Sequence, residues 1–120
     1  MGKLTTHVLD TALGKPGAGI KLELYRLAGA PGSARALAAS AVTNQDGRCV
    51  QPLLEGAAFS AGQYELIFFA GDYFARQGLK AAEPRFLDEV VIRFGIAAPD
   101  EHYHVPLLLS PYSYSTYRGS

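Results

Sequence analysis

The segment Ile20–Tyr25 reads IKLELY, with an aliphatic side chain at every second position. Successive side chains of an extended chain point to opposite faces, so the three aliphatic residues share one face while Lys21, Glu23 and Tyr25 share the other. Such a strand covers an apolar core on one side and leaves its other side to water. The segment therefore predicts a half-buried β-strand.

Seven further segments have the same character, and glycine or proline separates them about every ten residues. The turns Gly14–Gly17 and Asn44–Gly47 supply the positive-φ and side-chain-capping residues that chain reversals need. Between two of the strands, Asp72–Gly78 predicts one short helix, with Asp72 as its N-cap and Gly78 as its end. Eight short strands predict an all-β fold of two packed sheets. They are Leu4–Asp10, Ile20–Tyr25, Leu37–Thr43, Arg48–Leu53, Gln63–Ala70, Leu87–Phe94, His102–Leu109 and Tyr112–Tyr117.

The overall composition excludes several classes of protein. The 120 residues fit one domain over positions 1–120, and 11 Lys and Arg against 11 Asp and Glu leave a formal net charge of zero, without the basic surface that nucleic acids attract. The apolar runs are much shorter than the ~20 residues of a membrane helix. The one cysteine, Cys49, has no partner for an internal disulfide, and the first residues lack the pattern of a signal peptide. We therefore expect a cytoplasmic protein that binds neither nucleic acid nor membrane.

Three histidines are candidate reactive groups. His7 lies on the face of its predicted strand opposite Leu4 and Val8, where a lone histidine is more often structural than catalytic. His102 and His104 stand two residues apart and share one face, which is also the geometry of a metal-binding pair. The further nitrogen or sulfur ligands are His7 and Cys49, and no carboxylate falls at motif spacing, so no metal is predicted.

Other polar residues have ordinary structural interpretations. Arg48 follows a tight turn, where an arginine is commonly a solvated edge charge. Cys49 points to the opposite strand face and is expected to be a packed thiol rather than a nucleophile. Ser110, Ser113 and Ser115 lack the G-x-S-x-G pattern of serine hydrolases, so covalent catalysis is disfavoured.

The C-terminal stretch 102–120, HYHVPLLLSPYSYSTYRGS, has a far more specific pattern. It closely resembles the terminal signature of the 5-hydroxyisourate hydrolases, the transthyretin-related enzymes of purine degradation. Residues 4–10 (LTTHVLD) and 43–48 (TNQDGR) are similar to two further stretches of that family, and the resemblance spans essentially the whole chain. One departure is Asp88, where the family commonly has proline before the strand that begins near Glu89; this change affects an edge turn and casts no doubt on the site.

This resemblance implies both a structure and a reaction. It implies a transthyretin-like sandwich of two four-stranded sheets with one short helix, and a homotetramer, a dimer of dimers, with sites at the dimer–dimer interface. The reaction is the hydrolysis of 5-hydroxyisourate to 2-oxo-4-hydroxy-4-carboxy-5-ureidoimidazoline, without cofactor or metal. The positions matching the family's catalytic residues are His7, Arg48 and His104. Those expected to bind substrate are His7, Arg48, Ser115, Tyr117, Arg118, Gly119 and Ser120.

These residue types suit the attack of water on a ring carbonyl. One histidine of the His7 and His104 pair would take a proton from water, while Arg48 and the other histidine orient substrate and stabilise the oxyanion. Which histidine is the base stays open. A nearby guanidinium is expected to lower the pKa of an imidazole and keep it neutral. The alternatives are a transthyretin-like carrier of small ligands and a sandwich that serves only in protein contacts.

Overall fold

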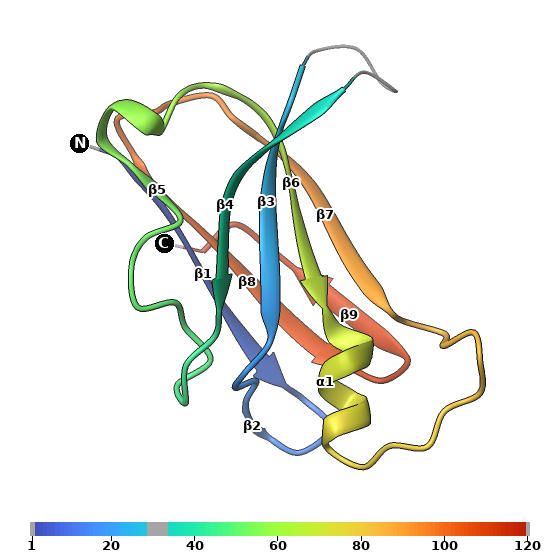
Figure 1. Ribbon diagram of the computed structural model, residues 1–120. Helices are drawn as coiled ribbons and strands as arrows, with labels where there is room; N and C mark the ends of the chain where they lie inside the picture. Colours follow the sequence, from blue (N-terminus) through green and yellow to red (C-terminus); the bar gives the residue numbers. More distant parts are fainter. Residues whose placement is uncertain (1, 29–33, 120) are drawn as a thin grey trace.

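Two β-sheets face each other in the computed structural model, which describes residues 2–28 and 34–119 (Figure 1). One sheet has the order β2-β1-β8-β9, with the short β5 also paired to β1, and the other has the order β4-β3-β6-β7. The first comprises β1 (Lys3–Asp10), β2 (Lys15–Pro16), β5 (Leu54–Glu55), β8 (His102–Ser110) and β9 (Ser113–Thr116). The second comprises β3 (Lys21–Leu27), β4 (Arg35–Val42), β6 (Gly62–Phe69) and β7 (Glu89–Ile96). The predicted sandwich of two sheets is confirmed, but the first sheet has five strands rather than four, because the short β2 and β5 both pair with β1.

The predicted helix exists but begins earlier, because its first turn is held by backbone rather than by a side-chain cap. Helix α1 runs over Ala70–Arg76, and the 3-10 turn η1 covers Gly56–Ala58. The N–H of Gly71 donates to the carbonyl of Asp88 (2.9 Å), so Asp72 lies in the first turn and is not the N-cap. No helix within the described ranges is both long and apolar enough to cross a membrane.

The predicted strand Arg48–Leu53 is wrong. The N–H of Val8 donates to Gly47 (2.9 Å) and that of Leu53 to Leu4 (2.8 Å), so both ends of the segment are tied to β1. Gly47 to Leu53 is six steps along the chain, whereas Leu4 to Val8 is only four. The two extra residues cannot pair with β1, so the segment bulges away from that strand. Arg48 is left in an isolated β-bridge to His7.

The other predicted strand ends differ more modestly. The strand placed at Leu87–Phe94 is β7, shifted by two residues to Glu89–Ile96. The reason is that Asp88 belongs to the preceding loop. Its carbonyl accepts a hydrogen bond from the N–H of Gly71, and its carboxylate pairs with Arg85 (3.0 Å). The strand placed at Leu37–Thr43 is β4, Arg35–Val42.

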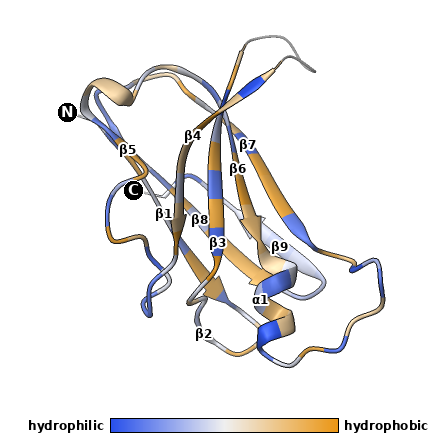
Figure 2. Ribbon diagram, viewed as in Figure 1, coloured by the Kyte–Doolittle hydropathy of each residue, from blue (hydrophilic) through white to orange (hydrophobic). Residues whose placement is uncertain are grey.

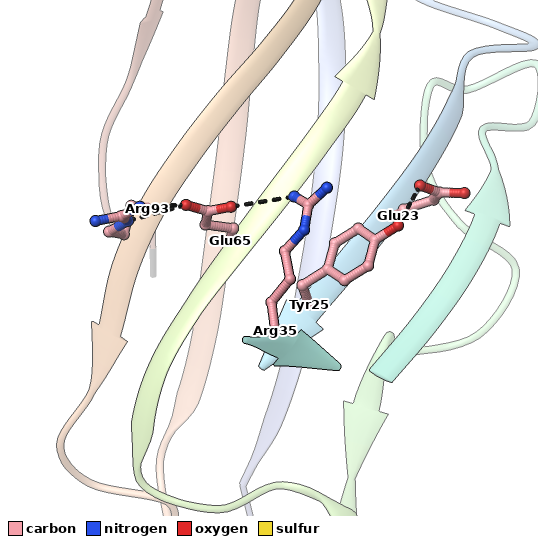
Figure 3. Close-up of polar contacts among 5 residues, drawn as sticks. All are labelled: Glu23, Tyr25, Arg35, Glu65 and Arg93. Carbon is pink, nitrogen blue, oxygen red and sulfur yellow. Dashed lines mark hydrogen bonds and ion pairs between the residues drawn. The ribbon is translucent and has the colours of Figure 1, made fainter. Parts of the chain in front are cut away.

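The core lies between the sheets and is formed by alternating apolar residues. Figure 2 shows the hydrophobic stretches along the strands of both sheets. Ile20, Leu22 and Leu24 are completely buried, as the alternation predicts. The outer face of the second sheet is instead charged. Figure 3 shows Glu65 between two guanidinium groups: Arg93 donates to its carboxylate from Nη2 (2.6 Å) and Nε (3.0 Å), and Arg35 from Nη1 (3.3 Å).

The pairing of β1 with β8 places the candidate residues. The two strands run parallel in the middle of the first sheet, with Lys3 opposite His102, Thr5 opposite His104 and His7 opposite Pro106. Directly paired residues project from the same face of a sheet. The three histidines therefore lie on the outer face of the first sheet, behind the core residues that alternate with them.

Candidate active site

An open cleft of about 470 Å³ lies on this outer face. It is formed by β1, by β8, by the residues after the turn 44–47 and by the C-terminal tail. Its lining residues are Thr5, Thr6, His7, Arg48, Cys49, His102, His104, Tyr117 and Gly119. Another cavity, of about 280 Å³ beside α1, is lined by residues 71–87 and 111–112 and includes none of the predicted site residues.

His7 and His104 form a directly hydrogen-bonded pair in the cleft. His7 Nδ1 and His104 Nε2 lie 2.6 Å apart, and the two rings stack with centroids 4.8 Å apart and an interplanar angle of 18°. His7 is half-buried and His104 is only 9% exposed. A single proton is shared in this bond, so one ring nitrogen donates and the other accepts.

Burial is the main influence on both histidines. It lowers the pKa of His7 below the ordinary 6.5, and the charge of Arg48 lowers that pKa further. Burial likewise lowers the pKa of His104, assisted by the charges of His7, Arg48 and His102. The predicted direction is confirmed, although desolvation outweighs the guanidinium that the sequence pointed to. Both imidazoles are therefore neutral at pH 7 and able to accept a proton.

Arg48 reaches the cleft because of a tight turn against β1. The side chain of Asn44 accepts from the N–H groups of Asp46 (2.9 Å) and Arg48 (3.1 Å). Gly47 has φ +73°, and a Cβ there would lie 2.4 Å from the carbonyl of Val8, so only glycine allows this approach. Within the described residues, no carboxylate pairs with the Arg48 guanidinium, which is exposed and available to a ligand.

Pro106 determines how the C-terminal tail, residues 117–119, runs beside β8. Strand β9 pairs with β8 as far as Thr116 opposite Leu107, and Pro106 beyond it has no N–H to continue the ladder. The hydroxyl of Thr116 donates to the Pro106 carbonyl (2.7 Å) instead. The chain returns to β8 at Gly119, whose N–H donates to the His104 carbonyl (2.8 Å).

The tail residues divide between the cleft and the surface beside it. Tyr117 and Gly119 line the cleft. Arg118 donates instead to Glu101 (2.8 Å) and lies over the ring of Tyr103 (3.9 Å). Ser115 lies on β9 opposite Leu108 and does not line the cleft. Ser120 falls outside the described residues. The substrate-binding role expected of Ser115, Arg118 and Ser120 stays a prediction.

The structure adds to the site two residues, Thr5 and His102, that sequence reasoning did not assign to it. Thr5 Oγ1 lies 2.7 Å from His104 Nδ1 and 2.7 Å from His102 Nε2. Sequence reasoning weighed His102 as a metal ligand and as part of a polar strand face. No group of three or more His, Cys, Asp or Glu in the described part of the chain could hold a metal ion. Only the parallel register of β1 and β8 reveals the contact.

The resulting arrangement is that of a polar acid–base site. A neutral imidazole pair can take a proton from water, and an adjacent guanidinium can stabilise an oxyanion. Cys49 lines the same cleft, but burial raises the pKa of its thiol, which disfavours the nucleophilic thiolate.

Comparisons with known proteins find similar proteins over nearly the whole chain. A family model described as HIUase/Transthyretin family matches residues 4–119. The 5-hydroxyisourate hydrolase of Pseudomonas aeruginosa is 62% identical over 120 residues, which cover 100% of this chain and 93% of that protein.

Two solved structures show the same sandwich. A crystal structure of (S)-allantoin synthase matches with a TM-score of 0.90 and 50% identity over 99% of this chain, which spans only 44% of that longer chain. Sea bream transthyretin, solved in complex with thyroxine, matches with a TM-score of 0.84 and 28% identity, covering 98% of this chain and 94% of the transthyretin. The fold is therefore transthyretin-like.

Proposed function

The chain belongs to the HIUase/Transthyretin family, and on that premise we propose that it hydrolyses 5-hydroxyisourate to 2-oxo-4-hydroxy-4-carboxy-5-ureidoimidazoline. The observation that carries this proposal is the hydrogen-bonded pair of His7 and His104 in one cleft with Arg48, whose guanidinium pairs with no carboxylate of the described residues. The 62% identity to a 5-hydroxyisourate hydrolase supports the same substrate. We propose that residues 1–120 act as one domain.

His7 is the proposed general base. Both ring nitrogens of His104 are engaged, one by His7 and one by Thr5, whereas in the described residues His7 Nε2 has no hydrogen-bond partner. His7 Nε2 takes a proton from water as the water oxygen attacks the ring carbonyl, and Arg48 stabilises the resulting oxyanion. When the ring C–N bond breaks, the proton on His7 Nε2 passes to the leaving nitrogen.

Catalysis without a cofactor or metal is consistent with these roles. The attacking water supplies both the hydroxyl of the new carboxyl group and the proton of the leaving nitrogen. Tyr117 and Gly119 would close the cleft around the flat ring, with Ser115, Arg118 and Ser120 as further proposed contributors. Holding the ring in attack geometry accounts for a large part of such rate enhancements.

We further propose that the active form is a homotetramer, a dimer of dimers, with the clefts at the dimer–dimer interface. Strand β9 ends the first sheet, and Tyr112, Tyr114 and Tyr117 on or beside it are 64%, 44% and 59% exposed. Large exposed aromatic side chains at a sheet edge favour contact with another copy of the chain. Analytical ultracentrifugation checks the tetramer. A truncated protein lacking residues 117–120 is expected to lose most of its activity, and full activity in it would contradict this dependence.

The deciding experiment follows the ultraviolet absorbance of freshly made 5-hydroxyisourate with the parental protein beside Arg48→Ala. Parental protein should speed the decay well above the buffer rate, and Arg48→Ala should be slower by about 10²-fold, the typical effect of losing an oxyanion-stabilising group. His7→Ala and His104→Ala should each lower kcat by about tenfold or more without unfolding. Parental turnover in both histidine variants would disprove the assigned roles.

The alternative is a carrier that binds a small ligand without altering it. The structural similarity to a transthyretin in complex with thyroxine favours this alternative. An unchanged absorbance decay together with tight binding would support it over the hydrolase. We also propose that the protein works in the cytoplasm, because its one cysteine is a free thiol suited to a reducing compartment.

A further inference from the structure

Four polar groups that line the cleft form a continuous hydrogen-bonded chain, which ends at the exposed His102. It runs from His7 Nδ1 to His104 Nε2 (2.6 Å), from His104 Nδ1 to Thr5 Oγ1 (2.7 Å), and from Thr5 Oγ1 to His102 Nε2 (2.7 Å). The burial of the rings changes along this path, since His104 is buried and His102 is exposed. The mechanism above uses only the first two members.

We propose that Thr5 and His102 are positioning residues that complete a reversible proton relay, which moves the positive charge accepted by His7 out to His102 and returns the proton for the leaving nitrogen. The proposal rests on the proposed hydrolase function. It adds two side chains to the reaction without placing either in contact with substrate.

The direction of the hydrogen bonds in the resting state follows from the need for a free base. His7 Nε2 accepts a proton only if the ring carries its own hydrogen on Nδ1, which then donates to His104 Nε2. His104 must in turn carry its hydrogen on Nδ1 and donate to Thr5, whose single hydroxyl hydrogen donates to His102 Nε2. All four groups are neutral in this arrangement.

Each proton moves one place when water is activated. His7 gains the water proton at Nε2 and gives its Nδ1 proton to His104 Nε2. His104 gives its Nδ1 proton to Thr5 Oγ1, and Thr5 gives its hydroxyl proton to His102 Nε2. The net result is hydroxide added to the carbonyl carbon and one positive charge on His102. The reverse movement delivers the His7 Nε2 proton to the leaving nitrogen and restores the resting chain.

Desolvation of the His7 and His104 rings and the charge of Arg48 favour moving the positive charge away from this pair. Arg48 lies beside the buried pair, and its charge lowers the pKa values of both His7 and His104. An imidazolium held there would face both desolvation and a second cation. His102 is exposed to water, with Lys3 as its register partner on β1 and Glu101, which pairs with Arg118 (2.8 Å), next to it in the chain.

The test uses substitutions that distinguish the hydrogen bonds of the Thr5 hydroxyl from the packing of the Thr5 side chain. Thr5→Val removes the hydroxyl and keeps the shape, Thr5→Ser keeps the hydroxyl, and His102→Gln can still accept from Thr5 but cannot carry a proton. Thr11→Val is the matched control, since the hydroxyl of Thr11, just after the end of β1, donates to the carbonyl of Leu109 (3.2 Å). The measurements are kcat, KM and the dependence of kcat on the deuterium content of the solvent.

Thr5→Val and His102→Gln are expected to lower kcat by about tenfold or more with KM within about twofold, while Thr5→Ser and Thr11→Val stay near the parent. In mixtures of light and heavy water, the parent should give the curved dependence of several protons in motion, and the two slow variants a straight line. Parental kcat in His102→Gln, equal losses in Thr5→Ser and Thr5→Val, or a straight line for the parent would each overturn the relay. Absence of parental hydrolysis would instead refute the proposed function.

Discussion

Substituting alanine for Gly119 tests how tightly the tail holds the catalytic pair. A Cβ at position 119 would lie 2.9 Å from His104 Cδ2, and 3.4 Å from both His104 Cβ and Pro106 Cγ. Ordinary contact with a Cβ begins at 3.4 Å, so the ring or the tail must move by at least 0.5 Å. Movement of the ring stretches or tilts the 2.6 Å bond to His7, and movement of the tail breaks the 2.8 Å bond from Gly119 to His104.

The expected loss follows from the sensitivity of catalysis to position. A misplacement of about 1 Å can cost about 10²-fold in rate, so a displacement half as large corresponds to about tenfold in kcat. The melting temperature should change by less than about 4 °C, because the contact lies at the end of the chain and a glycine-to-alanine change restricts the unfolded chain in compensation. Activity and stability should therefore separate in this variant.

The assay is the absorbance decay of 5-hydroxyisourate, with thermal unfolding measured on the same samples. Gly95→Ala is the control, because a Cβ there meets only the carbonyl of Gly62 at 4.0 Å. The control should keep the parental kcat. A Gly119→Ala protein that turns over substrate within about twofold of the parent would show that the pair tolerates the displacement, and the reasoning from geometry would be refuted.

Three further outcomes are expected. Tyr73→Phe leaves one Asp10 oxygen without the hydroxyl that donates to it at 2.7 Å, so the free energy of unfolding should fall by about 1–3 kcal/mol with kcat unchanged, and an unaltered denaturant midpoint would contradict this. The profile of kcat/KM against pH should fall on the acid side at a pH below 6.5, since His7 must be neutral to act as the base. Arg48→Gln removes a charge that lowers the pKa of His7 and should move this fall to higher pH, whereas Arg48→Lys keeps the charge and should not. Hydrogen bonds from Arg93 lower the pKa of Glu65 below 4.5, so this ion pair stabilises the fold above pH 4.5 and the stabilisation is lost as the pH falls. The difference in melting temperature between the parent and Glu65→Gln should therefore shrink as the pH is lowered. A difference that stays constant with pH would argue against the pairing.

The sequence by itself determined which side of each strand faces the core and where the chain reverses. The alternation of Ile20–Tyr25 dictates its buried face because side-chain direction in an extended chain is a local property. The turn Asn44–Gly47 is likewise local, since its hydrogen bonds join residues at most four apart. His7, His104, Arg48 and the tail were identified through family resemblance, and the cleft brings His7, Arg48, His104, Tyr117 and Gly119 together.

Only the tertiary structure decided how these groups meet. The register of β1 against β8 joins residues almost a hundred positions apart, and it alone places Thr5 between two histidines. The sequence predicts a strand over 48–53, yet the two extra residues between its contacts with β1 prevent pairing. The burial that lowers both histidine pKa values also depends on packing around the rings. Such properties depend on distances between remote segments, which a local pattern of side chains does not specify.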